Sequence, residues 1–131
     1  MKKLIVGLLA LLILTACAGG SPATIKGQWE LVSHGSASSQ TPAVADVETS
    51  IEFLDGQLSG NVGCNGFGGE YEVDGDTLKF GPVMSTMMFC EGRMDAEQSF
   101  LTKLQAAVGY TATKKTLKIF TPKDLMTFKA T

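Results

Sequence analysis

Apolar and polar residues mostly alternate in short runs from Gly27 to the end of the chain, and turn residues separate the runs. Alternation with a period of two is typical of strands that bury one face. Asp55-Gly56 and Asp74-Gly75 favour hairpin turns between consecutive strands. The pattern predicts strands over 28–34, 48–54, 57–62, 71–73, 77–80, 117–119 and 125–128. We expect these strands to form a compact antiparallel sheet that curls into a barrel-like shape.

Residues 95–108 depart from this alternation, because their apolar side chains recur with helical spacing. Asp95 is the predicted N-cap, Gln98 completes a capping box, and Gly109 follows the last turn. A helix with one apolar stripe must bury it, so we expect this helix to cover an open face or mouth of the barrel. The serine-rich segment 37–45 is predicted to be a long exposed loop. The predicted fold class is therefore mainly β, with one amphipathic helix packed against the sheet.

The amino terminus has the pattern of an export signal. Two lysines precede an apolar run over 4–14, and small residues lead from there to Cys17. The run is shorter than the roughly 20 residues that a membrane-spanning helix needs. A buried N-terminal helix is the alternative, but the run has no polar face to turn toward water.

Leu14-Thr15-Ala16-Cys17 resembles the lipobox of bacterial lipoproteins. The resemblance implies cleavage before Cys17 and attachment of fatty acyl chains such as palmitate, and several chains on one residue anchor a protein stably to a membrane. We therefore expect a lipoprotein signal peptide over 1–16, a lipidated cysteine with a flexible tether over 17–26, and one domain over 27–131. The lipoprotein sorting pattern, with alanine rather than aspartate at Ala18, favours the periplasmic face of the outer membrane in a cell that has one.

Charge argues against one class of partner. Removal of residues 1–16 would take away two of the 11 basic residues and none of the 13 acidic ones, which leaves a net charge near −4. Binding to nucleic acid depends on clustered Lys and Arg, so we do not expect a nucleic-acid partner. The remaining chain has the length of one domain, and we expect it to fold as a monomer without a cofactor.

Cys64 and Cys90 remain once Cys17 is assigned to lipid. An even pair of cysteines in an exported chain predicts a disulfide. A bridge across this loop would stabilise the domain by about 3.5 kcal/mol on the chain-entropy estimate. Two free buried thiols are the alternative.

Five glycines gather between residues 60 and 69. A phosphate-binding loop needs a helix directly after it, whereas a predicted strand at Tyr71 follows here. We therefore interpret these glycines as positions of positive φ or of close backbone approach, at a tight bend or bulge.

A set of spaced residues carries a family resemblance. The set is Gly63, Cys64, Asn65, Gly69, Tyr71, Thr86, Met88 and Cys90, followed by the predicted helix with Glu97 and Phe100 and by Leu117, Ile119, Leu125 and Phe128. It resembles the META domain of HslJ-type lipoproteins over 27–129, with Phe89 where the family usually has a small residue. The resemblance implies a compact β-rich fold with one helix. It implies no agreed biochemical activity.

Four methionines, Met84, Met87, Met88 and Met94, cluster in the sequence around Cys90. Soft sulfur ligands in an exported protein could hold Cu(I). Methionine more often fills irregular gaps in a core, and Met88 already belongs to the family pattern. We therefore expect a structural role for these residues and keep a Cu(I) site as the alternative.

Little in the sequence indicates catalysis. His34 is the single histidine, and no nucleophile elbow, His-x-x-x-His pair or cluster of acids accompanies it. Asp74 and Asp76 lack the further oxygen ligands of a calcium loop. We therefore expect a protein that is not an enzyme.

The function that we expect is that of a lipid-tethered envelope domain, which binds another envelope component or supports envelope integrity under stress. The tether motivates this expectation, because it keeps the domain near the membrane surface. An inhibitor of an envelope-directed hydrolase, such as a protease or lysozyme, is the alternative. Its binding loops would be the segment 33–45 and the bend at 65–68.

Overall fold

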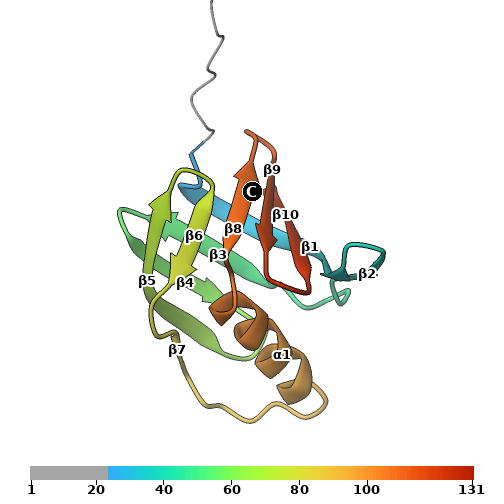
Figure 1. Ribbon diagram of the computed structural model, residues 1–131. Helices are drawn as coiled ribbons and strands as arrows, with labels where there is room; N and C mark the ends of the chain where they lie inside the picture. Colours follow the sequence, from blue (N-terminus) through green and yellow to red (C-terminus); the bar gives the residue numbers. More distant parts are fainter. Residues whose placement is uncertain (1–23) are drawn as a thin grey trace, which may run out of the picture.

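The computed structural model describes residues 24–131 (Figure 1). The predicted signal peptide over 1–16, the predicted lipidation site at Cys17 and the predicted tether up to residue 23 lie outside the described residues. Within 24–131, no helix has both the length and the apolar character that crossing a membrane requires.

Ten strands and one helix make up the described part of the chain. The elements before the helix are β1 (Gly27–Ser36), β2 (Ser39–Pro42), β3 (Ser50–Leu54), β4 (Gln57–Asn61), β5 (Gly66–Asp74), β6 (Thr77–Phe80) and β7 (Met84–Ser85). The helix and the elements after it are α1 (Met94–Gln105), β8 (Gly109–Ala112), β9 (Thr116–Phe120) and β10 (Leu125–Ala130).

The strands form one antiparallel sheet that closes into a barrel (Figure 1). Neighbouring strands follow the order β10-β9-β8-β6-β5-β4-β3-β1, and β1 closes the ring by pairing with β10. β2 extends the sheet beyond β1, and the short β7 pairs with β5. The predicted mainly β, barrel-like fold with one helix is confirmed.

The core consists of the side chains that alternate toward the inside of the barrel. The aromatic ring of Tyr71 packs edge to face on that of Phe53, with 5.0 Å between the ring centroids. Each large side chain that is fully buried contributes about 1.5–3 kcal/mol of transfer free energy. The largest of these are Phe53, Phe128, Ile51, Leu78, Leu104, Leu117, Ile119 and Met126.

The barrel is least continuous between β6 and β8, where Thr77 and Gly109 form the single residue pair of the ladder. Helix α1 lies across the end of the barrel near this gap, at the bottom of Figure 1. It buries Phe100 and Leu104 in the core. The helix therefore covers a mouth of the barrel, as its apolar stripe predicted.

Gln105, the last residue of α1, fastens the helix to the chain that leaves β6. Its Nε2 donates hydrogen bonds to the carbonyl oxygens of Gly81 (2.8 Å) and Phe80 (3.4 Å), and its Oε1 accepts one from the N–H of Val83 (3.1 Å). These bonds satisfy backbone groups at the end of β6 and in the segment between β6 and β7. No local pattern marks Gln105 in the sequence, because its partners lie 22 to 25 residues earlier in the chain.

The prediction of Asp95 as the N-cap is wrong. Arg93 is the N-cap and makes no side-chain capping bond, while Asp95 lies inside the first turn, where its charge favours the positive end of the helix dipole. The helix starts early because the N–H of Arg93 donates to the carbonyl oxygen of Cys90 (3.2 Å) and turns the chain. The helix ends at Gln105, and Gly109 begins β8, a strand that the pattern did not predict.

The segment 37–45, predicted to be a loop, contains β2. The strand β1 continues to Ser36, and the two strands pair from Ser36 with Ser39 to Ser33 with Pro42. The Nε2 of Gln40 holds this hairpin by donating to the carbonyl oxygens of Gly35 and Ser36, both at 2.9 Å. The residues of β2 are exposed, as predicted. The hydrophobic pattern could not predict this strand, because none of its residues is buried. It is a strand only because its backbone pairs with β1.

The packed domain includes the last residues of the predicted tether, Ile25 and Lys26. Ile25 is buried in the core, and its carbonyl oxygen accepts a hydrogen bond from the indole Nε1 of Trp29 at 2.8 Å. Lys26 forms an ion pair with Asp55 in the turn between β3 and β4. The chain is therefore fixed to the barrel two residues before β1.

Candidate functional site

The loop that links β7 to α1 is tied to the bend between β4 and β5. A disulfide joins Cys64 in the bend to Cys90 in the loop, and the two Cα atoms are 6.1 Å apart. The structure thus contains the predicted bridge, and not the alternative pair of free thiols. The bridge brings together the two halves of the family motif, which are far apart in the sequence.

Asn65 is the centre of a buried hydrogen-bond network, with only 3% of its surface exposed. Its side-chain oxygen accepts hydrogen bonds from the hydroxyl of Thr86 (2.8 Å) and from the backbone N–H of Met88 (2.7 Å). Its Nδ2 donates to the carbonyl oxygen of Met88 (3.0 Å) and to Oε2 of Glu97 (2.7 Å). The amide therefore uses its full capacity of two donated and two accepted bonds.

Glu97 brings a buried carboxylate from α1 to the same network, with 4% of the residue exposed. Its Oε1 accepts a hydrogen bond from the N–H of Cys64 (2.7 Å), and its Oε2 accepts the one from Asn65. A buried carboxylate needs such partners to offset its loss of water. Because both oxygens accept hydrogen bonds from the bend, Glu97 fastens the helix to the bend.

Two glycines meet the requirements predicted for this stretch, Gly63 in the bend and Gly60 just before it in β4. Gly63 has a φ of +111°, which side chains rarely adopt, and a Cβ at Gly60 would overlap the ring of Phe67. Positive φ and close approach were both predicted. The bend, however, is confined to 62–65, and Gly69 lies in β5 with regular pairing. The prediction of a bend or bulge is therefore wrong for the second half of the stretch, whereas close backbone approach holds there too, since a Cβ at Gly69 would lie 2.9 Å from the carbonyl oxygen of Pro82.

An apolar surface lies beside this network. Met84, Met87, Met88 and Phe89 have exposed side chains, with 93% of Met87 and 80% of Phe89 accessible. We call these four residues the apolar ridge. The backbone that carries them is held at Met88 by Asn65 and just beyond Phe89 by the disulfide. The ridge is therefore presented by a loop of fixed conformation.

A groove runs between β7 and α1. Two adjoining hollows, of about 430 and 260 Å³, share Ser85, Gln98 and Leu101 as lining residues. The larger hollow extends along the helix toward Gln105, and the smaller one reaches Met87, Phe89 and Met94. We call this feature the β7–α1 groove. Two residues of the apolar ridge, Met87 and Phe89, line its smaller end.

Three of the four methionines do not have the predicted structural role. Met84, Met87 and Met88 belong to the ridge, so the expectation that they fill gaps in the core is wrong. The sulfur of Met94 accepts a hydrogen bond from the N–H of Cys90 at 3.5 Å. Because Cys90 is in the disulfide, a soft-metal site would have to rely on thioethers alone. Residues 24–131 contain no group of three or more His, Cys, Asp or Glu residues that could hold a metal.

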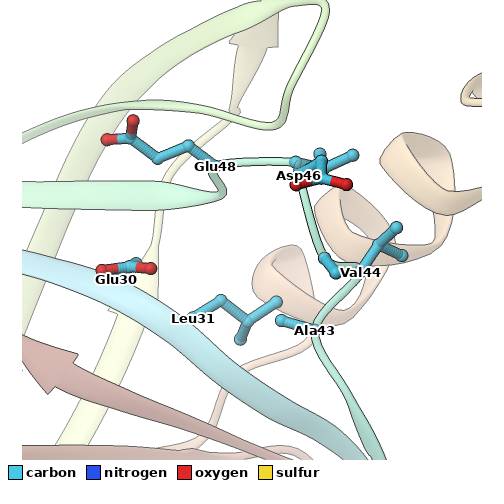
Figure 2. A pocket seen from close by; sticks show the side chains of 8 residues that line it. Glu30, Leu31, Ala43, Val44, Asp46 and Glu48 are labelled. Atoms are coloured by element: carbon cyan, nitrogen blue, oxygen red, sulfur yellow. The ribbon is translucent and has the colours of Figure 1, made fainter.

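A second hollow lies between β1 and the chain that follows β2. Figure 2 shows Glu30, Asp46 and Glu48 around it, with Leu31 and Val44 on its wall. Glu30 is paired with Lys129 at 3.1 Å. The hollow is open and acidic, and it presents neither a nucleophile nor a histidine.

His34 lies in β1 and faces the helix. Its Nδ1 is 3.0 Å from Nζ of Lys103, and the ammonium donates, so this ring nitrogen is the acceptor. Burial, and then the positive charge of Lys103, hold the pKa of His34 below its ordinary value of 6.5. The contact joins α1 to the barrel, so we interpret it as structural.

The two segments that could serve an inhibitor differ in exposure. The segment 33–45 forms the β1–β2 hairpin, and its tip is exposed. The segment 65–68 is not an exposed loop, because Asn65 and Phe67 are buried and the rest belongs to β5.

The chain is similar to one known family and to several solved structures. The family model of the META domain matches residues 23–131. A protein from Burkholderia xenovorans solved by NMR has a similar fold, with a TM-score of 0.69, 19% identity, and coverage of 81% of this chain and 82% of that one. A DUF4847 family protein from Bacteroides vulgatus, solved by crystallography, has a TM-score of 0.62 and 16% identity, with coverage of 79% and 92%.

These structural likenesses are at low identity and show the fold alone. A search of curated proteins found no significant relative. The family resemblance inferred from the motif residues is nevertheless confirmed, because the match to the family model covers all of the described residues. The protein belongs to the META domain family.

Proposed function

We propose that this protein is a lipid-anchored lipoprotein of the cell envelope, whose META domain is a non-catalytic module that binds another envelope protein. The observation that carries the proposal is the apolar ridge. Soluble domains rarely keep several large apolar side chains together in water, and such patches mark interaction sites. Aromatic residues and methionine are enriched in the centres of protein interfaces.

The fixed backbone beneath the ridge supports a binding role. Asn65 and the disulfide hold the loop, so less conformational freedom is lost when a partner binds. A loop that served only as a connection would not need a buried network of this size. The network therefore favours binding through the ridge.

The position of the ridge suits an anchored protein. Figure 1 shows the first described residues and the turn between β8 and β9 at one end of the barrel, and α1 with the segment after β7 at the other. A tether attached at the amino terminus would leave the ridge directed away from its own attachment point. The domain would then present the ridge to a partner rather than to the anchoring membrane.

Anchoring is tested by growing cells with labelled palmitate. We expect label on the wild-type protein and none on a Cys17→Ser variant. Absence of label from the wild type, or an intact Met1 on cytosolic protein, would contradict the envelope part of the proposal.

Binding through the ridge is tested by site-specific photo-crosslinking in cells. A photoreactive residue replaces Phe89 in one strain and Lys114, in the turn between β8 and β9, in a control strain. We expect a discrete crosslinked protein of the envelope at position 89 and not at 114. Equal crosslinking at both positions, or none at 89, would contradict the assignment of the ridge.

A further inference from the structure

We propose that the β7–α1 groove binds an extended, uncharged peptide segment, which adds as a strand to the outer edge of β7. This inference rests on the proposed function, since it assigns the class of partner segment that the module would bind. Four features of the described chain support it: the edge of β7, the shape of the groove, its lining and its charge.

The outer edge of β7 has backbone groups free for a further strand. In the antiparallel pairing with β5, Phe67 lies opposite Ser85, and the N–H of Thr86 donates to the carbonyl oxygen of Gly66 at 2.9 Å. Because backbone groups of successive residues in a strand point to opposite sides, the N–H and C=O of Ser85 point away from β5. They face the groove, on the same side as the N–H of Val83.

Val83 shows that this edge is accessible to hydrogen-bonding partners from the helix side. Its N–H is bonded to the side chain of Gln105, at the far end of the groove. Ser85, two residues later, has no such partner from α1 within the described chain. A peptide strand would pair with β7 at Ser85, whose backbone groups receive no hydrogen bond from α1 within residues 24–131.

The shape of the groove fits a linear ligand. The two hollows adjoin at Ser85, Gln98 and Leu101, and α1 residues from Met94 to Gln105 line them, so together they follow the helix over most of its length. Leu101 lies at their junction, and Met87 and Phe89 line the smaller end. Side chains of an added strand point alternately into and out of such a groove. Apolar residues at every second position would therefore contact Leu101 and the ridge.

The charge of the groove lining indicates which kind of peptide segment can bind. Glu97 is the only charged residue that lines either hollow, and both of its oxygens are already bonded. The other polar lining groups are neutral amides and hydroxyls. A phosphate or carboxylate would lose its water and find no cation in return. An uncharged segment with alternating apolar residues complements this lining.

The test uses a random heptapeptide display library and the exported Cys17→Ser protein. We expect the library to yield uncharged peptides with alternating apolar residues. Their synthetic forms should bind at least about tenfold more weakly to Gln98→Arg and Leu101→Arg variants, which place a charge in the groove. Leu54→Arg is the matched control, because it charges an exposed apolar residue away from the groove, and it should leave binding unchanged.

Backbone pairing is tested by N-methylation of the selected peptide. Methylation at alternate residues in one register should reduce affinity at least about tenfold, because it removes the N–H groups that pair with β7, while the other register should be tolerated. Gln98 is exposed, and circular dichroism of its variant checks that folding is intact.

Several outcomes would overturn the inference. These are a library without enriched peptides, peptides that bind Gln98→Arg as well as the parent, and equal effects of methylation in both registers. Self-association that is lost in Gln98→Arg, measured by sedimentation, would instead assign the groove to a second copy. Binding to phosphatidylethanolamine and phosphatidylglycerol vesicles that is lost in the same variant would assign it to lipid. None of these outcomes would change the results of the palmitate and crosslinking experiments, which test the proposed function separately.

Discussion

The buried network around Asn65 makes a strong prediction for the substitution Asn65→Asp. This change keeps the size of the side chain and both hydrogen bonds that its oxygen accepts, from Thr86 and from the N–H of Met88. It removes the two donations of Nδ2, to the carbonyl oxygen of Met88 and to Glu97. It also places a second carboxylate beside Glu97.

The expected loss of stability follows from those two bonds. A lost hydrogen bond to a charged group costs about 1.5–3 kcal/mol, and leaving a neutral partner unpaired costs about 1 kcal/mol or more. Repulsion between two buried carboxylates adds to this. We expect a decrease of roughly 3–4 kcal/mol in the free energy of unfolding at pH 7. That is a large part of the 5–15 kcal/mol that is typical of a domain.

Urea unfolding followed by the fluorescence of Trp29, the single tryptophan and a buried one, measures this difference. The matched control is Asn61→Asp. Asn61 is exposed and its side-chain oxygen only accepts, from the N–H of Gly63 at 2.6 Å, so a carboxylate can replace it. We expect a change within about 0.5 kcal/mol for the control. Equal effects of the two substitutions would refute the role of Asn65 as the centre of the network.

Three further predictions concern other parts of the domain. Replacing both cysteines, in Cys64→Ala/Cys90→Ala, should lower the free energy of unfolding in urea by about 3.5 kcal/mol, because the unfolded chain is no longer constrained; a loss below about 1 kcal/mol would argue against that account. The lowered pKa of His34 means that the unfolded chain takes up a proton first as the pH falls below 6.5, so stability should decrease from pH 7 to pH 5.5. His34→Gln should show a smaller decrease over this range, and an identical one would exclude His34 as a cause. Dilute hydrogen peroxide should oxidise the exposed Met87 about tenfold or more faster than the fully buried Met126, as measured by peptide mass spectrometry, and equal rates would be inconsistent with the exposure of the ridge.

Local signals in the sequence were sufficient for much of the barrel. Asp55 and Gly56 have φ values of 49° and 83°, as a tight hairpin turn of this type requires, and their dipeptide indicated the turn. Alternation placed Ile51 and Phe53 on the buried face. Such features depend on residues that are neighbours in the chain, so a single sequence contains them.

Features that depend on distant residues could not be predicted in this way. The role of Glu97 comes from Asn65, 32 residues earlier, and only the fold brings the two together. The exposure of Met87 and Phe89 is likewise invisible in a periodic pattern, because the bonds that hold their loop away from the core come from another element. The family resemblance marked several of these positions, but it did not indicate what they do.

The ring of strands is not uniformly strong. Six residue pairs join β1 to β10, whereas one pair joins β6 to β8. Strands with few ladder bonds separate at a lower free-energy cost, so thermal opening of the ring begins at this joint, and its amides exchange with solvent first. Because Gln105 fastens α1 to the chain that leaves β6, an occupant that immobilises the helix would slow exchange of the Val83 amide, which donates its hydrogen bond to Gln105.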